Sequence, residues 1–293
     1  MKHIVLLTKT YNVNDFDTWY KYHKAMGWIV HVIDNESKEA LKGRMNLTNG
    51  DTYDRLVGWP DQWKLFSDIL NENRFGFAEN ELVAFIDDDE YIWFYQDYWK
   101  KFEERNPQFA GKTYKTIEEY VDECLANFEN TSIVLMPQIL MSTPCINDSR
   151  ETKANLIDFS LFRRDDKSAQ GKCIIKYKSS LVYNFKHSDT AEQGHVPFTA
   201  TSQFGFDKNA VRRSVVNGCA ISYSTYGSVD PNACLRLYHY HIKSRRDWEE
   251  KFNRGSAAVE HQWYNHNIYK NMNAGGYVVP DFTMLQTKRL YNV

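Results

Sequence analysis

Four consecutive acidic residues, Asp87 to Glu90, follow a short apolar run from Leu82 to Ile86, and apolar residues resume at Tyr91. The run is long enough for a buried strand and too short for a helix. Adjacent carboxylates repel one another, and burial beside an apolar strand adds a desolvation cost, so the segment calls for a compensating cation. Side chains alternate along an extended backbone, so Asp87 and Asp89 would face one way and bind Mg²⁺ or Mn²⁺, leaving positions for water and phosphate oxygens.

Other interpretations of the acidic segment differ in how they fit the spacing. A solvated acidic turn after a core strand is the plainest alternative, since a short D-x-D pattern is common. A calcium loop of the EF-hand type is excluded, because Tyr91 and Ile92 stand where an acid or amide and a glycine are needed. A phosphatase with an aspartate nucleophile stays open, because it too places acids at a strand end.

A second group of chemically capable residues lies late in the chain. His239 and His241 precede Lys243 and two arginines, one of which is Arg246. A histidine there could complete a metal shell, and the basic residues could hold a diphosphate. The alternative is a strand whose tyrosines and histidines pack in the core. Ser244 and the acid three residues later resemble a capping box, which predicts that a helix follows.

The first 90 residues predict an alternating α/β unit. Residues 3–7, 28–33 and 82–86 are expected to be strands, and residues 16–26 show the apolar spacing of a helix with a cap at Asp15 or Asp17. Asp61 is expected to open a second helix. Parallel strands joined by helices place their carboxyl ends at one edge, so three polar segments should meet there: 8–12, 34–37 and 87–90.

The second half predicts more strands in a mixed arrangement. A capping box at Thr116 and Glu119 begins a helix expected to reach Phe128, and residues 132–136 are expected to form a strand. Residues 156–162, 173–177 and 181–185 also have the composition of strands.

Composition limits the class of protein. A chain of 293 residues with a net charge of −2 favours one domain and gives no concentrated basic surface for nucleic acid. No apolar run is long enough for a signal peptide or membrane helix, so a soluble, cytoplasmic protein with no membrane span is expected. Five cysteines without a C-x-x-C pair argue against a zinc site or disulfide framework. Aromatic residues make up 15% of the chain, which suits a core and a site for amphipathic ligands.

Four stretches in order along residues 1 to 255 resemble GT-A fold glycosyltransferases, most closely family 92 and its family-2-like relatives. They are Tyr11-Asn12 with Trp19 and Tyr22-His23; Val32 to Ser37; Phe85 to Tyr91; and His239-Tyr240 with Lys243-Ser244, Lys251 and Arg254-Gly255. The resemblance implies an α/β, Rossmann-like nucleotide-diphospho-sugar transferase fold with a mostly parallel central sheet. It implies one domain over residues 1–293, with a nucleotide-sugar-binding half at 1–95 and an acceptor-binding half with C-terminal helices at 96–293.

The resemblance also implies roles for individual residues. Donor-binding residues would be Thr8, Tyr11, Asp34, Asp88 and Lys243, with the first three near the uridine of a UDP-sugar. Metal ligands for Mn²⁺ or Mg²⁺ would be Asp87, Asp89 and His239. The metal would stabilise the departing nucleoside diphosphate as a Lewis acid.

An inverting transfer to an oligosaccharide or glycan acceptor also needs a carboxylate that takes the acceptor proton. The chain lacks the Glu-Asp pair that family-2 enzymes place downstream of the D-x-D. Asp189 and Glu192 are the favoured candidates, with Asp158, His187 and His195 as further choices and Glu90 as a group that orients metal-bound water. A cation-dependent carbohydrate-binding protein without catalysis and a metal-dependent phosphohydrolase are the competing functions.

Overall fold

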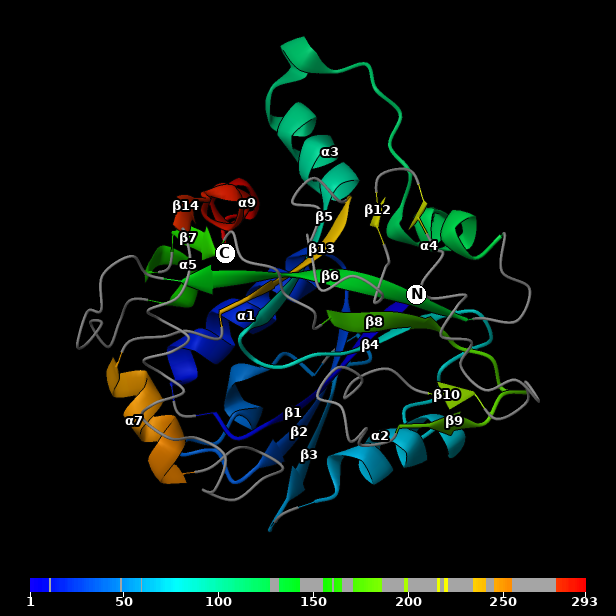
Figure 1. The fold of residues 1–293 in the computed structure, drawn as a ribbon, viewed down its shortest axis with the longest axis vertical. Helices are drawn as coiled ribbons and strands as arrows, with labels where there is room; N and C mark the ends of the chain where they lie inside the picture. The colour runs from blue at the N-terminus through cyan, green and yellow to red at the C-terminus, as the bar shows by residue number, and fades with distance from the viewer. Residues whose placement is uncertain are drawn as a thin grey trace.

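A mixed sheet of ten strands forms the middle of the molecule (Figure 1). The structure is a computed structural model and describes residues 1–10, 12–47, 49–58, 60–126, 132–142, 155–159, 161–164, 171–185, 198–199, 215–216, 219–220, 234–240, 245–254 and 278–293. The strands of the sheet are β1 (Lys2–Thr8), β2 (Ile29–Asn35), β3 (Thr52–Leu56), β4 (Leu82–Phe85), β5 (Glu90–Phe94), β6 (Ile133–Ser142), β7 (Phe162–Arg164), β8 (Gly171–Lys176), β13 (Leu235–His239) and β14 (Val278–Pro280).

Helices and two short hairpins surround this sheet. The α-helices are α1 (Val13–Ala25), α2 (Gln62–Asn71), α3 (Tyr95–Arg105), α4 (Ile117–Leu125), α5 (Leu156–Phe159), α7 (Arg245–Arg254) and α9 (Thr283–Tyr291), and the 3₁₀ turns are η1 (Lys42–Arg44) and η2 (Pro107–Phe109). The hairpins pair β9 (Tyr183–Asn184) with β10 (Phe198–Thr199), and β11 (Val215–Val216) with β12 (Cys219–Ala220). Within the described ranges, no helix has the length and apolar character needed to cross a lipid bilayer.

The N-terminal half confirms the predicted parallel unit. β1 pairs in parallel with β2 on one side and with β4 on the other, and β3 extends the sheet beyond β2. Thr8 lies opposite Asp34 in the β1–β2 register, so the two strands end together. The chain therefore builds outward from β1 through β2 to β3, then crosses back to place β4 on the other side of β1.

Local capping explains where the helices begin. Asp61 caps α2 as predicted, since its side chain accepts hydrogen bonds from two backbone N–H groups of the first turn. The capping box of Thr116 and Glu119 is present at α4, which ends at Leu125, before the predicted end. The cap predicted for α1 at Asp15 or Asp17 is wrong: Asn12 caps the helix through its side chain, one residue before the first helical position.

The second half contributes antiparallel strands, as the mixed arrangement predicts. β8 is antiparallel to both β4 and β6, and β13 lies between β5 and β6, antiparallel to the first and parallel to the second. Residues 156–162 do not form one strand: Leu156–Phe159 is a helical turn, and only Phe162 continues into β7. The helix predicted after Ser244 is α7.

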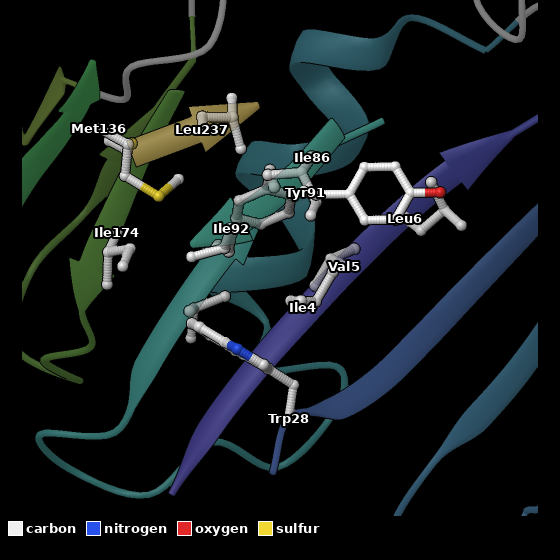
Figure 2. Close-up of a cluster of buried hydrophobic side chains, with 14 of the residues drawn as sticks. Ile4, Val5, Leu6, Trp28, Ile86, Tyr91, Ile92, Met136, Ile174 and Leu237 are labelled. Carbon is white, nitrogen blue, oxygen red and sulfur yellow. The ribbon is translucent and has the colours of Figure 1, made fainter. Parts of the chain in front are cut away.

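The core forms where β1 and β4 pack against their neighbours (Figure 2). Ile4, Val5 and Leu6 of β1 are fully buried, and Figure 2 shows them beside Ile86 and Tyr91, which flank the acidic segment. The strand that delivers the acidic residues is therefore fixed on both sides by apolar packing, which contributes about 1.5–3 kcal/mol for each large side chain buried.

Candidate functional site

The acidic segment lies at the carboxyl ends of β1 and β4. β2 and β3 lie on one side of β1 and β4 lies on the other, so the order of the strands in the sheet reverses between β1 and β4. Open parallel sheets bind ligands in the crevice outside such a reversal point. β4 ends at Phe85, Asp88 and Asp89 form a turn, and Glu90 begins β5. The three polar segments predicted to meet at this edge do so through the contacts described next.

Asp88 faces the end of β1. Its Oδ2 accepts hydrogen bonds from the hydroxyl of Thr8 at 2.8 Å and from that of Thr10 at 2.6 Å, and both threonines are buried. The backbone N–H of Thr10 donates to Oγ of Ser37 at 2.8 Å. One carboxylate thus joins the first and third polar segments, while Thr10 joins the first to the second.

Asp34 closes the turn after β2. Its Oδ1 accepts from the N–H of Ser37 at 2.9 Å and its Oδ2 from the Tyr53 hydroxyl at 2.8 Å, and the residue is buried. Burial and this bond to Asp34 raise the pKa of Tyr53 to about 12, so the phenol stays a donor. Asp34 therefore fixes the turn after β2, and a nucleoside contact would share an oxygen that already has a partner.

Asp89 and His239 come together across β5 and β13. Asp89 precedes β5, His239 ends β13, and the N–H of Tyr240 donates to the Asp89 carbonyl at 2.8 Å. The Oδ1 of Asp89 lies 3.5 Å from Nε2 of His239, and both residues are buried. Two residues 150 positions apart in sequence thus lie side by side.

His239 is held from its other side. Its Nδ1 contacts the side-chain amide of Gln138 on β6 and lies 3.8 Å from Oε1 of Glu90. A donor on Gln138 would place the ring proton on Nε2, toward Asp89, whereas a cation bound to Nε2 needs that proton on Nδ1, toward Glu90. The Gln138 atom that contacts Nδ1 is the amide nitrogen, a donor, so the structure matches the tautomer with the proton on Nε2; a cation at Nε2 would require the amide to turn its oxygen toward Nδ1.

The predicted alternation of the four acids is wrong, because the chain turns at Asp88 and Asp89 and does not run through all four residues as one extended strand. Asp87 and Glu90 both face Lys172 of β8: its Nζ lies 3.0 Å from Oδ2 of Asp87 and 3.4 Å from Oε2 of Glu90. Burial alone would lower the pKa of Lys172, but the two carboxylates outweigh it and raise the pKa. Burial raises the pKa of Glu90, and Lys172 opposes that change. The protein itself thus supplies one of the cations that the acidic segment requires.

Asp89 and His239 present one oxygen and one nitrogen atom 3.5 Å apart that could bind a cation together. No group of three or more His, Cys, Asp or Glu side chains in the described part of the chain is arranged to hold a metal ion. A carboxylate and an imidazole leave several positions for water and phosphate oxygens, which is how Mg²⁺ is bound in nucleotide sites. The donor set fits a cation that a diphosphate helps to hold, and it does not fit a closed protein cage.

Several predicted site residues lie outside the described ranges. They are Tyr11, His187, Asp189, Glu192, His195 and Lys243. Of the described alternatives, Asp158 is paired with Lys288 at 2.6 Å, and Arg246 is exposed on α7. Glu90 is fully buried inside the turn, a position suited to shaping the turn and not to orienting an exposed water.

Thr10, Gln138 and Lys172 belong to the site but are absent from the residues that the sequence singled out. Gln138 interrupts the apolar run of residues 133–141, and Lys172 directly precedes the apolar run Cys173-Ile174-Ile175. A polar side chain within a buried strand needs a partner, and that signal could have marked both residues. The identity of the partner depends on strand order, which the pattern does not contain.

No protein-family model matches the sequence, and no curated protein matches it significantly.

Proposed function

We propose that the protein is a metal-dependent glycosyltransferase that moves a sugar from a nucleotide-sugar donor, a UDP-sugar, to a glycan acceptor. The proposal includes a GT-A type of Rossmann-like fold and an inverting reaction. It rests on the resemblance of the sequence and on the side chains gathered at the carboxyl ends of β1 and β4.

The observation that carries the proposal is the pairing of Asp89 with His239 beside the reversal point of the sheet. Their 3.5 Å separation offers one oxygen and one nitrogen ligand at the place where α/β sheets bind nucleotides. Carboxylate and water ligands suit both Mn²⁺ and Mg²⁺, and the resemblance assigns His239 to the same ion. When bound, the cation would neutralise the charge that develops on the leaving diphosphate.

The other described residues have one of two roles in this proposal: some fix the turns that follow the strands, and others contact the donor. Thr8 and Thr10 fix Asp88 at the end of β1, and Asp34 fixes the turn after β2. We assign the diphosphate to the space beside Asp89 and the nucleoside to the wall formed by Thr8 and Asp34. The acceptor and the base, Asp189 or Glu192, belong to the second half of the chain in this proposal.

A thermal-shift panel with UDP, GDP and several UDP-sugars, each with and without Mn²⁺, tests the proposal. Ligand at one hundred times its Kd stabilises the folded state by about 2.7 kcal/mol. We expect a shift that requires both a UDP compound and Mn²⁺, and release of UDP from one of the UDP-sugars when a glycan acceptor is present.

Asp89→Ala should abolish both the shift and the release of UDP. Asp54→Ala is the matched control, since Asp54 lies on β3 in an exposed ion pair with Arg74. Stabilisation by a sugar with Ca²⁺ and no response to any nucleotide would instead indicate the carbohydrate-binding function. Hydrolysis of a phosphate ester without acceptor would indicate the phosphohydrolase.

A further inference from the structure

Lys172 is a buried lysine that contacts the acidic turn, residues 87–90. Only 5% of its side chain is exposed, and its Nζ is within 3.4 Å of carboxylates at both ends of the turn, Asp87 and Glu90. A buried ammonium is stable only when it is paired and hydrogen-bonded. β8 also carries Lys176, which pairs with Asp122 at 2.6 Å at the periphery, so two lysines on one strand have very different surroundings.

Glu90 closes the turn from the inside. Its Oε2 accepts a hydrogen bond from the N–H of Asp87 at 2.8 Å, and its own N–H donates to the Asp87 carbonyl at 3.1 Å. Its Oε1 lies 3.4 Å from the amide nitrogen of Gln138, and the indole N–H of Trp19 donates to its carbonyl at 2.7 Å. The carboxylate is therefore a fixed part of the backbone turn, and Lys172 balances its charge.

The acids within the turn differ in the partner that they face. Asp87 and Glu90 share Lys172, whereas Asp89 faces His239. The ammonium of Lys172 lies between Asp87 and Glu90. It would repel a divalent ion from that position, because two like charges a few ångströms apart in a buried site interact strongly. This repulsion would direct a divalent ion toward Asp89 and His239, whose oxygen and nitrogen lie 3.5 Å apart.

We propose that Lys172 is a positioning residue that holds the acidic turn in one shape before cation or donor binds, and that directs the cation to Asp89 and His239. The inference rests on the proposed function for its second part. Its first part concerns only the protein itself and can be measured without ligand.

Hydrogen exchange of the ligand-free protein tests the first part. We expect Lys172→Met to speed exchange of the amides of residues 86–91 by about tenfold or more, while amides of β1 keep their rate, because the turn would open locally. Lys176→Met removes the same kind of charge from the same strand and should leave residues 86–91 unchanged. The double variant Glu90→Gln with Lys172→Met avoids a buried unpaired carboxylate if the single variant does not fold, and it should show the same acceleration.

A Mn²⁺ titration in the presence of UDP tests the second part. We expect the concentration of Mn²⁺ needed for half of the thermal shift to rise about tenfold or more in Lys172→Met and to stay the same in Lys176→Met. Unchanged exchange in the Lys172 variants would overturn the positioning role. Failure of the wild-type protein to respond to UDP and Mn²⁺ would refute the proposed function, while the exchange comparison would still decide the role of Lys172.

Discussion

Two buried histidines should make the fold sensitive to mild acid. Burial lowers the pKa of both His23 and His31 to about 3. His23 lies within α1, with Nδ1 at 2.9 Å from the Trp19 carbonyl and Nε2 at 3.4 Å from the N–H of Ile92. Both are held neutral in the folded protein, and a proton on either would be a buried charge.

His31 belongs to a cluster at the opposite end of the sheet from the acidic turn. Its Nε2 lies 3.0 Å from Nδ1 of His3, which in turn bonds to Glu81 at 3.0 Å, and its Nδ1 lies 2.9 Å from the Thr52 hydroxyl. The ring stacks on Phe75 with centroids 4.3 Å apart. Burial is the main cause of the lowered pKa of His31, and the nearby charges that contribute act in the same direction.

The sign and size of the effect follow from linkage. A histidine with a folded pKa near 3 and an unfolded pKa near 6.5 contributes its full stability above pH 6.5 and loses it as the pH falls toward 3. Between pH 7 and pH 5 each of these histidines binds a proton in the unfolded state and stays neutral in the folded state. This difference lowers the free energy of unfolding by about 2 kcal/mol for each histidine.

Urea unfolding of the wild-type protein and of His31→Phe at pH 7, 6 and 5 measures this loss. The wild type should lose about 4 kcal/mol over the range from the two groups, and the variant about half of that. Phe75→Leu is the control, because it weakens the stack on His31 without removing a titratable group and should lower stability equally at each pH. Parallel pH profiles for the wild type and His31→Phe would refute the reasoning.

Three further predictions concern the site and the core. His239→Ala should weaken Mn²⁺ binding in the presence of UDP about 10- to 100-fold and leave residual binding, measured by titration, since one ligand of several is lost. Thr8→Val removes a buried hydroxyl that donates to Asp88 and should lower the free energy of unfolding by about 1–3 kcal/mol in urea. Phe66→Ala should cost about 3–5 kcal/mol in the same assay, because Phe66 of α2 is buried against Phe85 of β4 with ring centroids 4.5 Å apart.

The parallel half of the fold was predictable because its signals are local. The strands and caps around Leu82 and Asp61 follow from apolar runs and single capping residues that can be recognised within a few positions. Thr8 and Asp34 then lie next to each other because the carboxyl ends of neighbouring parallel strands lie at the same edge of the sheet.

The geometry of the acids was not predictable in the same way. Alternation assumes a strand, but the chain reverses direction at Asp88, and hydrogen bonds between Asp87 and Glu90 hold that reversal. Lys172 enters from a strand 85 residues later, so its partner is set by strand order and not by sequence spacing. In the sequence, the only sign of this non-local charge pair is a lysine that directly precedes an apolar run.

The placement of β13 between β5 and β6 has a consequence for how the protein is made. β5 and β6 are synthesised early, yet the strand that joins them arrives only with residues 235–239. During synthesis these two edges cannot pair with β13 until residue 239 has been added, so they are exposed to incorrect pairing for longer than the strands of the parallel half. Since His239 is on the same strand, the nascent chain contains the four acids of residues 87–90 before it contains the histidine that Asp89 contacts.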